Sequence, residues 1–135
     1  MYKKILLAFD GSEHSKRAAE HAVAMALLVQ DSSVEIINVI DIEKVKSEVL
    51  HQDIKKVRET TLEEVKEVFQ KANVSYELKV VHGEPGTMIV SHANEEKFDL
   101  IILGSRGLNA LQEMVLGSVS HRAVVRAHCP VLIIK

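Results

Sequence analysis

The chain has 135 residues, of which 47% are hydrophobic and 27% charged, a composition typical of one ordinary globular domain. Its 17 basic and 19 acidic residues are spread along the sequence and leave a net charge of −2, so no nucleic-acid partner is expected. The apolar run Ile5–Phe9 is too short for a signal peptide or a membrane span, so we expect a cytoplasmic protein without membrane contact. The single cysteine, Cys129, cannot form an internal disulfide and is expected to be a small buried side chain.

Five short apolar or β-branched runs, bounded by turn residues, predict five strands. In chain order these are Ile5–Phe9, Val34–Ile40, Tyr76–Val81, Leu100–Leu103 and Val131–Ile134.

Apolar residues that recur every three or four positions predict a helix after each of the first four strands. The first helix is capped by Ser12 and runs to about Gln30. The second is long, follows a charged loop at 41–47, and runs to Asn73. The third has Pro85 in its first turn.

The last predicted helix opens at Gly117-Ser118-Val119-Ser120, and its apolar spacing includes Val124. The apolar spacing of the long helix begins at Val49 and includes Val57. The apolar face of the third helix includes His92.

Regular alternation of strands and helices predicts an α/β fold in a single domain, residues 1–135. We expect an open, five-stranded parallel sheet in the order 3-2-1-4-5, with helices on both faces in a Rossmann-like arrangement. In this order strands one and four lie side by side where the winding reverses, and ligands bind at their carboxyl ends. Asp10 and Gly104 stand at those two ends, so both are expected in a ligand site.

The segment Leu103-Gly104-Ser105-Arg106-Gly107 and the helix start at Gly117 together predict a phosphate site. Glycine allows backbone N–H groups to approach a ligand closely, and a helix N-terminus presents free N–H groups and a positive dipole end. Arg106 adds a cation, and Ser118 and Ser120 add hydroxyls. The alternative interpretation is that these glycines are only turn and cap residues.

The pattern G-x2-G-x9-G-[S/T], formed by Gly104, Gly107, Gly117 and Ser118, resembles the ATP-binding branch of the universal stress protein family. Further segments similar to that family run along the chain, at Lys4–Ser12, Asn38–Asp41, Gly83–Pro85, Asp99–Gly107 and Cys129–Ile133.

The resemblance implies that an adenine nucleotide, ATP or AMP, lies across the point where the winding reverses. The glycines would surround the phosphates, Asp10 would lie near the ribose or a bound cation, and the backbone of Val39 would read the adenine. Ala8 stands where some nucleotide-binding relatives have proline. The implied binding residues are Ala8, Asp10, Val39, Leu103, Gly104, Arg106, Gly107, Gly117, Ser118, Val119 and Ser120.

The family resemblance also implies a homodimer through the last strand, formed by Val131, Leu132, Ile133 and Ile134. An apolar strand at the edge of a sheet would otherwise be exposed. Any bound Mg²⁺ is expected to take most of its ligands from the phosphates of the nucleotide. No protein metal site is expected, because His14 and His21 lie seven residues apart with no third ligand placed beside them.

The favoured function is that of a regulatory stress-response protein that binds nucleotide with little or no hydrolysis. Hydrolysis needs a group that orients water, and the nearest candidate by sequence is His121. A slow ATPase and a nucleotide-independent dimeric scaffold are the alternatives. A flavin or phosphoacceptor role is a further one, although Asp10-Gly11-Ser12 only half resembles a flavin-phosphate loop and Asp10 lacks the adjacent acidic residue of receiver domains.

Overall fold

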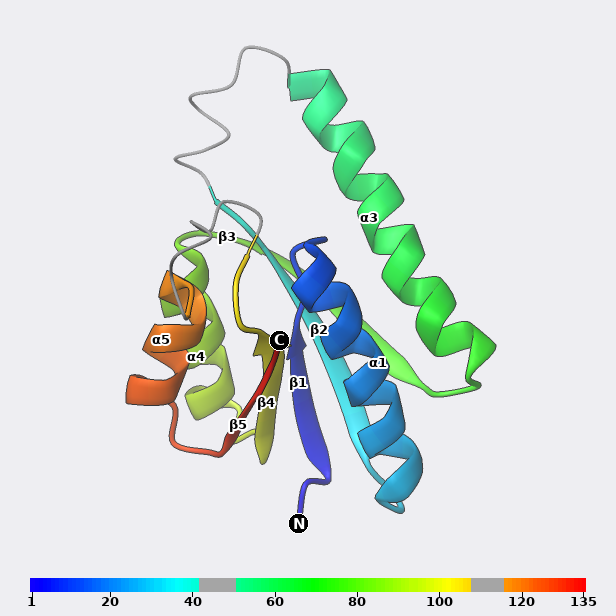
Figure 1. Ribbon diagram of the computed structural model, residues 1–135, viewed down its shortest axis with the longest axis vertical. Coiled ribbons are helices and arrows are strands. Elements are labelled where there is room, and N and C mark those ends of the chain that lie inside the picture. Colours follow the sequence, from blue (N-terminus) through cyan, green and yellow to red (C-terminus); the bar gives the residue numbers. More distant parts are fainter. Residues whose placement is uncertain (42–50, 108–115) are drawn as a thin grey trace.

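The computed structural model describes residues 1–41, 51–107 and 116–135 (Figure 1). The elements in chain order are β1 (Lys4–Ala8), α1 (Glu13–Leu28), β2 (Ser33–Ile40), α3 (His51–Lys71), β3 (Tyr76–His82), α4 (Pro85–Glu95), β4 (Leu100–Gly104), α5 (Ser118–Arg126) and β5 (Val131–Ile134). The predicted alternation of strand and helix is confirmed. Val49 and most of the predicted charged loop lie outside the described residues.

The five strands form one parallel sheet in the order β3-β2-β1-β4-β5, which confirms the predicted topology. The central strand β1 pairs with both β2 and β4, and Leu7 lies opposite Ile36 on one side and Ile102 on the other. Helices α1 and α3 cover one face of the sheet, and α4 and α5 cover the other (Figure 1). The carboxyl ends of β1 and β4 therefore lie next to each other.

Alternate residues of β1 enter two separate cores. Ile5 and Leu7 pack on the α1 and α3 side, while Leu6 and Ala8 pack on the α4 and α5 side. The three larger side chains are fully buried, and burial of each contributes roughly 1.5–3 kcal/mol. Because β1 is packed on both faces, its position along the sheet is fixed, and so is that of Asp10 just beyond its end.

Several element ends differ by one or two residues from the sequence prediction, among them those of the first strand and the first helix. Strand β1 ends at Ala8, although the Phe9 N–H still donates to the Ile37 carbonyl at 3.0 Å. Helix α1 ends at Leu28 rather than at about Gln30, because Val29 adopts an extended conformation (φ −104°, ψ 111°).

Helix α4 begins at Pro85, as predicted, and its N-cap is Glu84. The Glu84 carboxylate accepts hydrogen bonds from the N–H groups of Gly86 at 3.1 Å and Thr87 at 2.6 Å. Burial alone would raise the pKa of Glu84, but these hydrogen bonds and the Arg122 charge together lower it from its usual value.

Two valines that follow the helical spacing are exposed. The N-terminal half of α3 extends beyond the carboxyl edge of the sheet (Figure 1), and Val57 there is 66% exposed. In α5, Ala123 faces the core, and Val124 beside it is 52% exposed. On α4, His92 is half-buried in its predicted place, with its Nε2 atom 2.7 Å from Glu35 Oε1.

Candidate functional site

Three segments meet at the carboxyl ends of β1 and β4. A Cβ atom added to Gly107 would lie 2.8 Å from Asp10 Oδ2, so the glycine loop and the Asp10 carboxylate are in contact. A Cβ atom added to Gly104 would lie 2.5 Å from the His14 Cβ, so the end of β4 touches the first turn of α1. The structure thus brings Asp10, Gly104 and Gly107 together, as the strand order predicts.

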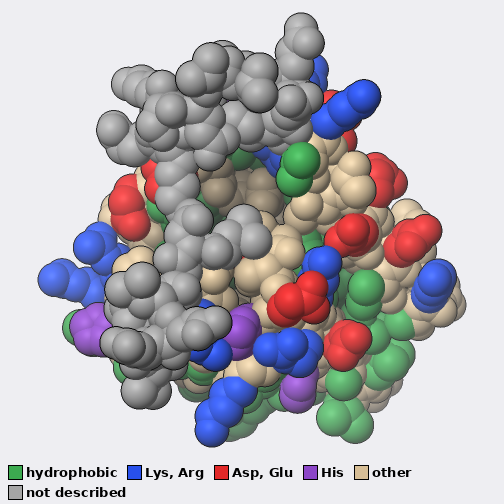
Figure 2. All heavy atoms as spheres, turned by 45° about the horizontal axis from the view of Figure 1, so that its top comes forward, with side chains coloured by type: hydrophobic (Ala, Val, Ile, Leu, Met, Phe, Trp, Pro, Cys, Tyr) green, Lys and Arg blue, Asp and Glu red, His purple; other side chains and the backbone are tan. Residues whose placement is uncertain are grey.

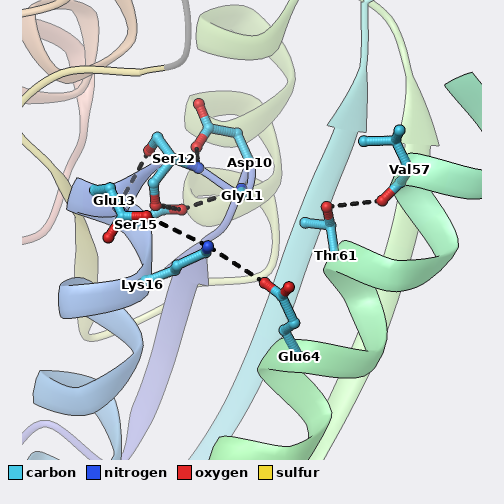
Figure 3. Close-up of polar contacts among 9 residues, drawn as sticks. All are labelled: Asp10, Gly11, Ser12, Glu13, Ser15, Lys16, Val57, Thr61 and Glu64. Carbon is cyan, nitrogen blue, oxygen red and sulfur yellow. Dashed lines mark hydrogen bonds and ion pairs between the residues drawn. The ribbon is translucent and has the colours of Figure 1, made fainter.

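The Asp10 turn is held by its own hydrogen bonds (Figure 3). The Ser12 N–H donates to Asp10 Oδ1 at 2.9 Å, and Ser12 Oγ caps α1 by accepting from the Ser15 N–H at 3.2 Å. The Gly11 N–H donates to Ser15 Oγ at 3.1 Å. Figure 3 shows the other carboxylate oxygen of Asp10 pointing away from the turn. The carboxylate is therefore exposed at the edge where a ligand would lie.

Helix α3 supports this turn from the side. Gly11 has φ +89°, and an added Cβ atom would lie 2.6 Å from Thr61 Cγ2. Glycine is therefore required at position 11 both by the backbone conformation and by the close approach of α3. Lys16 Nζ of α1 also lies 3.4 Å from Glu64 Oε2 of α3. Figure 3 shows this ion pair, which is exposed and contributes little to stability.

The glycine loop is tied to β5 and to the start of α5. The Ser105 N–H donates to the Ile134 carbonyl, and the Gly117 N–H donates to the Ser105 carbonyl, both at 2.7 Å. Ser120 is 2% exposed. Its hydroxyl is shared as a donor between two carbonyl oxygens, that of Ser105 at 2.9 Å and that of Gly117 at 3.0 Å. The Ser120 side chain therefore fastens the helix to the loop.

The N-terminal end of α5 faces the glycine loop. Gly117 is the N-cap and supplies no hydroxyl or carboxylate, so the positive end of the helix is not offset there by a capping side chain. Ser118 is exposed at the first helical position, and Val119 is half-buried. This end of α5 can accept an anion.

The ends of the neighbouring strands form the floor of the site. Ala8 is 7% exposed and Leu103 is 3% exposed, so both side chains lie in the core below the edge. The buried Asn38 donates from Nδ2 to the Phe9 carbonyl at 2.8 Å and joins the ends of β2 and β1. Val39 follows on β2 and is half-buried against the core beside α4 and α5.

Basic and acidic side chains are interspersed on this edge, as Figure 2 shows. Burial lowers the pKa of His14, and the charges of Arg17 and Arg106 lower it further, while Asp10 and Glu13 act in the opposite direction. Arg17 Nε also donates to the backbone oxygen of Lys135 at the end of β5, at 2.7 Å. The two cations that act on His14 therefore come from different segments, and Arg17 lies outside the glycine motif.

A cavity of about 430 Å³ lies along one side of α5. It is lined by Leu116, Gly117, Ser118, His121, Arg122, Val125 and Arg126. His121 thus lies with two arginines on the exposed side of α5. Among the residues that the structure describes, no group of three or more His, Cys, Asp or Glu side chains could hold a metal ion. Nor is any helix in those residues long and apolar enough to cross a membrane.

Comparison with known sequences identifies one family. A profile of the Universal stress protein family matches residues 1–135. Universal stress protein MJ0531 of Methanocaldococcus jannaschii is 34% identical over 142 residues, which cover 100% of this chain and 83% of that protein. Universal stress protein YxiE of Bacillus subtilis is 34% identical over 153 residues, which cover 100% of both chains.

Comparison with solved structures gives the same result. Hypothetical protein MJ0577 superposes with a TM-score of 0.80 and 34% identity, over 100% of this chain and 96% of that one. A universal stress protein in complex with cAMP has a TM-score of 0.74 and 25% identity, over 99% and 97% of the two chains. The universal stress protein from Archaeoglobus fulgidus in complex with dAMP shares the fold, with a TM-score of 0.74 and 24% identity over 99% and 98%.

Proposed function

Because this chain belongs to the universal stress protein family, we propose that it binds an adenine nucleotide, ATP or AMP, and acts as a regulatory protein with little or no hydrolysis. The observation that carries the proposal is the meeting of the Asp10 turn, the glycine loop and the start of α5 where the winding of the sheet reverses. The relatives in complex with cAMP and dAMP support an adenine nucleotide as the ligand.

The phosphates would lie between the glycine loop and the first turn of α5. Gly104 and Gly107 let the loop lie close to α1 and to Asp10, and the N–H groups of Ser118 and Val119 would donate from the helix end. The Arg106 side chain would add positive charge. The buried Ser120 hydroxyl would hold this arrangement together rather than contact the ligand through its side chain.

The nucleoside would extend from the phosphates toward β2. The exposed Asp10 carboxylate can accept hydrogen bonds from ribose hydroxyls, or lie near a cation carried by the phosphates. The backbone N–H and C=O of Val39 can pair with the adenine edge. Ala8 and Leu103, buried at the ends of β1 and β4, would close the site from below.

Little hydrolysis is proposed because no described residue of the site stands out as a group that would orient an attacking water. His121 lies on the exposed side of α5 with Arg122 and Arg126. The expected result is that His121→Ala leaves any slow turnover unchanged. A loss of turnover in this variant would favour the slow ATPase.

We also propose that two copies associate through β5. The carbonyl groups of Pro130 and Ile134 point toward β4 and accept hydrogen bonds there. The backbone groups of successive strand residues point to opposite sides, so the N–H and C=O groups of Val131 and Ile133 point away from the sheet. Strand β5 contains no charged residue, whereas the opposite edge strand β3 carries Glu77 and Lys79. An uncharged apolar edge favours pairing with another strand. If nucleotide does not bind, this edge supports the alternative of a dimeric scaffold.

The test is a calorimetric titration of nucleotide-stripped protein with ATP and Mg²⁺, and separately with AMP. We expect a dissociation constant below about 1 mM, equivalent to roughly −4 kcal/mol. Ser118→Glu places a carboxylate where the phosphates would lie, while a negative charge at a helix N-terminus leaves α5 stable. Two like charges about 5 Å apart repel by about 3 kcal/mol at an effective dielectric constant near 20, so affinity should fall at least about tenfold.

The matched control is Ser91→Glu, the same change at an exposed position of α4. It should leave the affinity unchanged. Absence of binding by the wild-type protein, or equal affinities for both variants, would contradict the proposed site.

A further inference from the structure

His14 occupies an unusual place on the edge of the sheet. It is the second residue of α1, and its Cβ atom and carbonyl carbon would lie only 2.5 Å and 2.8 Å from a Cβ atom at Gly104. The glycine at position 104 is therefore what allows the first turn of α1 to come this close to the loop. The half-buried His14 stands at the border of the proposed phosphate site although it is no part of the glycine motif.

Both signs of charge surround His14. The charges that act on it are those of Glu13 and Arg17 on its own helix, of Arg106 in the glycine loop and of Asp10 in the turn after β1. The positive end of α1 acts in the same direction as the two arginines. Burial and these cations outweigh the two carboxylates and keep the pKa of His14 below its usual value. In the free protein the surroundings of His14 therefore disfavour protonation of its imidazole.

We propose that His14 is a further contact for the nucleotide phosphates, and that its imidazole takes up a proton from solvent when the phosphates arrive. This inference rests on the proposed nucleotide binding and adds a residue and a pH dependence to it. The only covalent change is a new N–H bond on the ring, formed with the proton from solvent, and the resulting imidazolium donates a hydrogen bond to a phosphate oxygen beside Arg106.

The charges around His14 explain why its ring gains a proton, rather than loses one, when nucleotide binds. The phosphates bring negative charge into a region where two arginines repel an imidazolium, and this charge offsets the repulsion. The pKa of His14 is then higher in the bound protein than in the free protein. Binding consequently strengthens as pH falls toward the free-state pKa and weakens as pH rises through the bound-state pKa. The charge-assisted hydrogen bond forms only with the protonated ring, so the change in affinity should reach about tenfold.

The experiment compares the wild-type protein with His14→Gln, His14→Lys and His21→Gln. His21→Gln is the matched control, because His21 is exposed on the same helix two turns away from the loop. Each protein is titrated with MgATP at about pH 6 and about pH 8, in pairs of buffers that differ in their heat of ionisation. The pairs of buffers give the number of protons taken up on binding. The nucleotide's own titration is common to all four proteins and cancels in the comparison.

We expect proton uptake by the wild type and by His21→Gln, with affinity about tenfold higher at the lower pH. His14→Gln should bind weakly at both pH values with less uptake. His14→Lys should bind well at both, because its charge is permanent, and a merely structural role for His14 would not produce that rescue. Melting curves of the free variants check that each is folded.

Equal pH profiles for the wild type and His14→Gln would overturn the role of His14 while leaving the nucleotide site intact. Failure of wild-type protein and His14→Lys to bind at either pH would instead overturn the nucleotide site itself, and the role of His14 with it.

Discussion

Replacing Gly104 by alanine should destabilise the protein even in the absence of any ligand. The added Cβ atom would lie 2.5 Å from His14 Cβ, 2.8 Å from the His14 carbonyl carbon and 3.0 Å from the Ser15 nitrogen. Two of these three atoms belong to the backbone of α1, so no rotation of a side chain can relieve the contact. The first turn of α1 must move away from β4, together with the Asp10 turn that precedes it.

The cost of such overpacking is typically 1–3 kcal/mol, and we expect about 2 kcal/mol for Gly104→Ala. For a domain of this size, 1 kcal/mol corresponds to about 4 °C in melting temperature, so the midpoint should fall by about 8 °C. Gly117 is the matched control within the same motif. An added Cβ atom there meets its nearest neighbour, Arg106 Cα, at 3.4 Å, which is ordinary contact, and φ is −72°. Gly117→Ala should cost less than about 1 kcal/mol, the difference between glycine and alanine at an N-cap.

The assay is urea unfolding followed by circular dichroism, with calorimetry for the melting temperature. Adding His14→Ala to Gly104→Ala should not restore stability, because alanine keeps the Cβ atom and the backbone that cause the contact. Equal losses for Gly104→Ala and Gly117→Ala, or a Gly104→Ala protein as stable as the wild type, would refute this reasoning.

Three further predictions concern the turn, a helix cap and the dimer. Gly11→Ala should lower the free energy of unfolding by about 2 kcal/mol, and Thr61→Ser should restore part of this loss in urea unfolding, because it removes the contacting Cγ2 but not the positive φ. Glu84→Gln should cost less than about 1 kcal/mol near neutral pH. Because the pKa of Glu84 is lowered in the folded protein, the difference in stability between the wild type and Glu84→Gln should be present above the usual pKa of 4.5. The difference should vanish as pH falls through the folded-state pKa, and thermal melts at a series of pH values measure it. Val131→Pro removes an outward N–H of β5 and should convert the proposed dimer to monomer in sedimentation experiments; a wild-type monomer, or a variant dimer, would contradict pairing through this edge.

The parallel direction of the strands could be predicted from the sequence because each of the first four strand patterns is followed by a helix long enough to cross the sheet. Element ends were less accurate. The apolar spacing of α1 continues past Leu28, but the chain leaves the helix at Val29 and Asp31 adopts φ +63°. Val57 keeps helical spacing and is nevertheless exposed, because the part of α3 that carries it extends past the sheet. Periodicity identifies a face of a helix but does not say where the layer beneath it ends.

The glycine motif and the strand order together predicted where Asp10, Gly104 and Gly107 would meet. Contacts contributed by other segments could not be predicted, because neither Thr61 beside Gly11 nor His14 beside Gly104 belongs to a recognisable pattern. Spacing also cannot decide which way a serine at a helix start faces. Ser118 is exposed, whereas the Ser120 hydroxyl is turned to the Ser105 carbonyl.

The central position of β1 has a consequence for synthesis of the chain. Ile5 pairs with Val34 early in the sequence on one side, but on the other side it waits for Leu100, which is made after most of the chain. During that interval one edge of β1 has no partner, and such edges promote aggregation. The proposed nucleotide site combines Asp10 and Val39 with Gly117, so it is complete only when α5 has emerged from the ribosome. Nucleotide would then stabilise finished molecules by mass action but could not assist the first three strands, whose folding on the ribosome must proceed without the ligand.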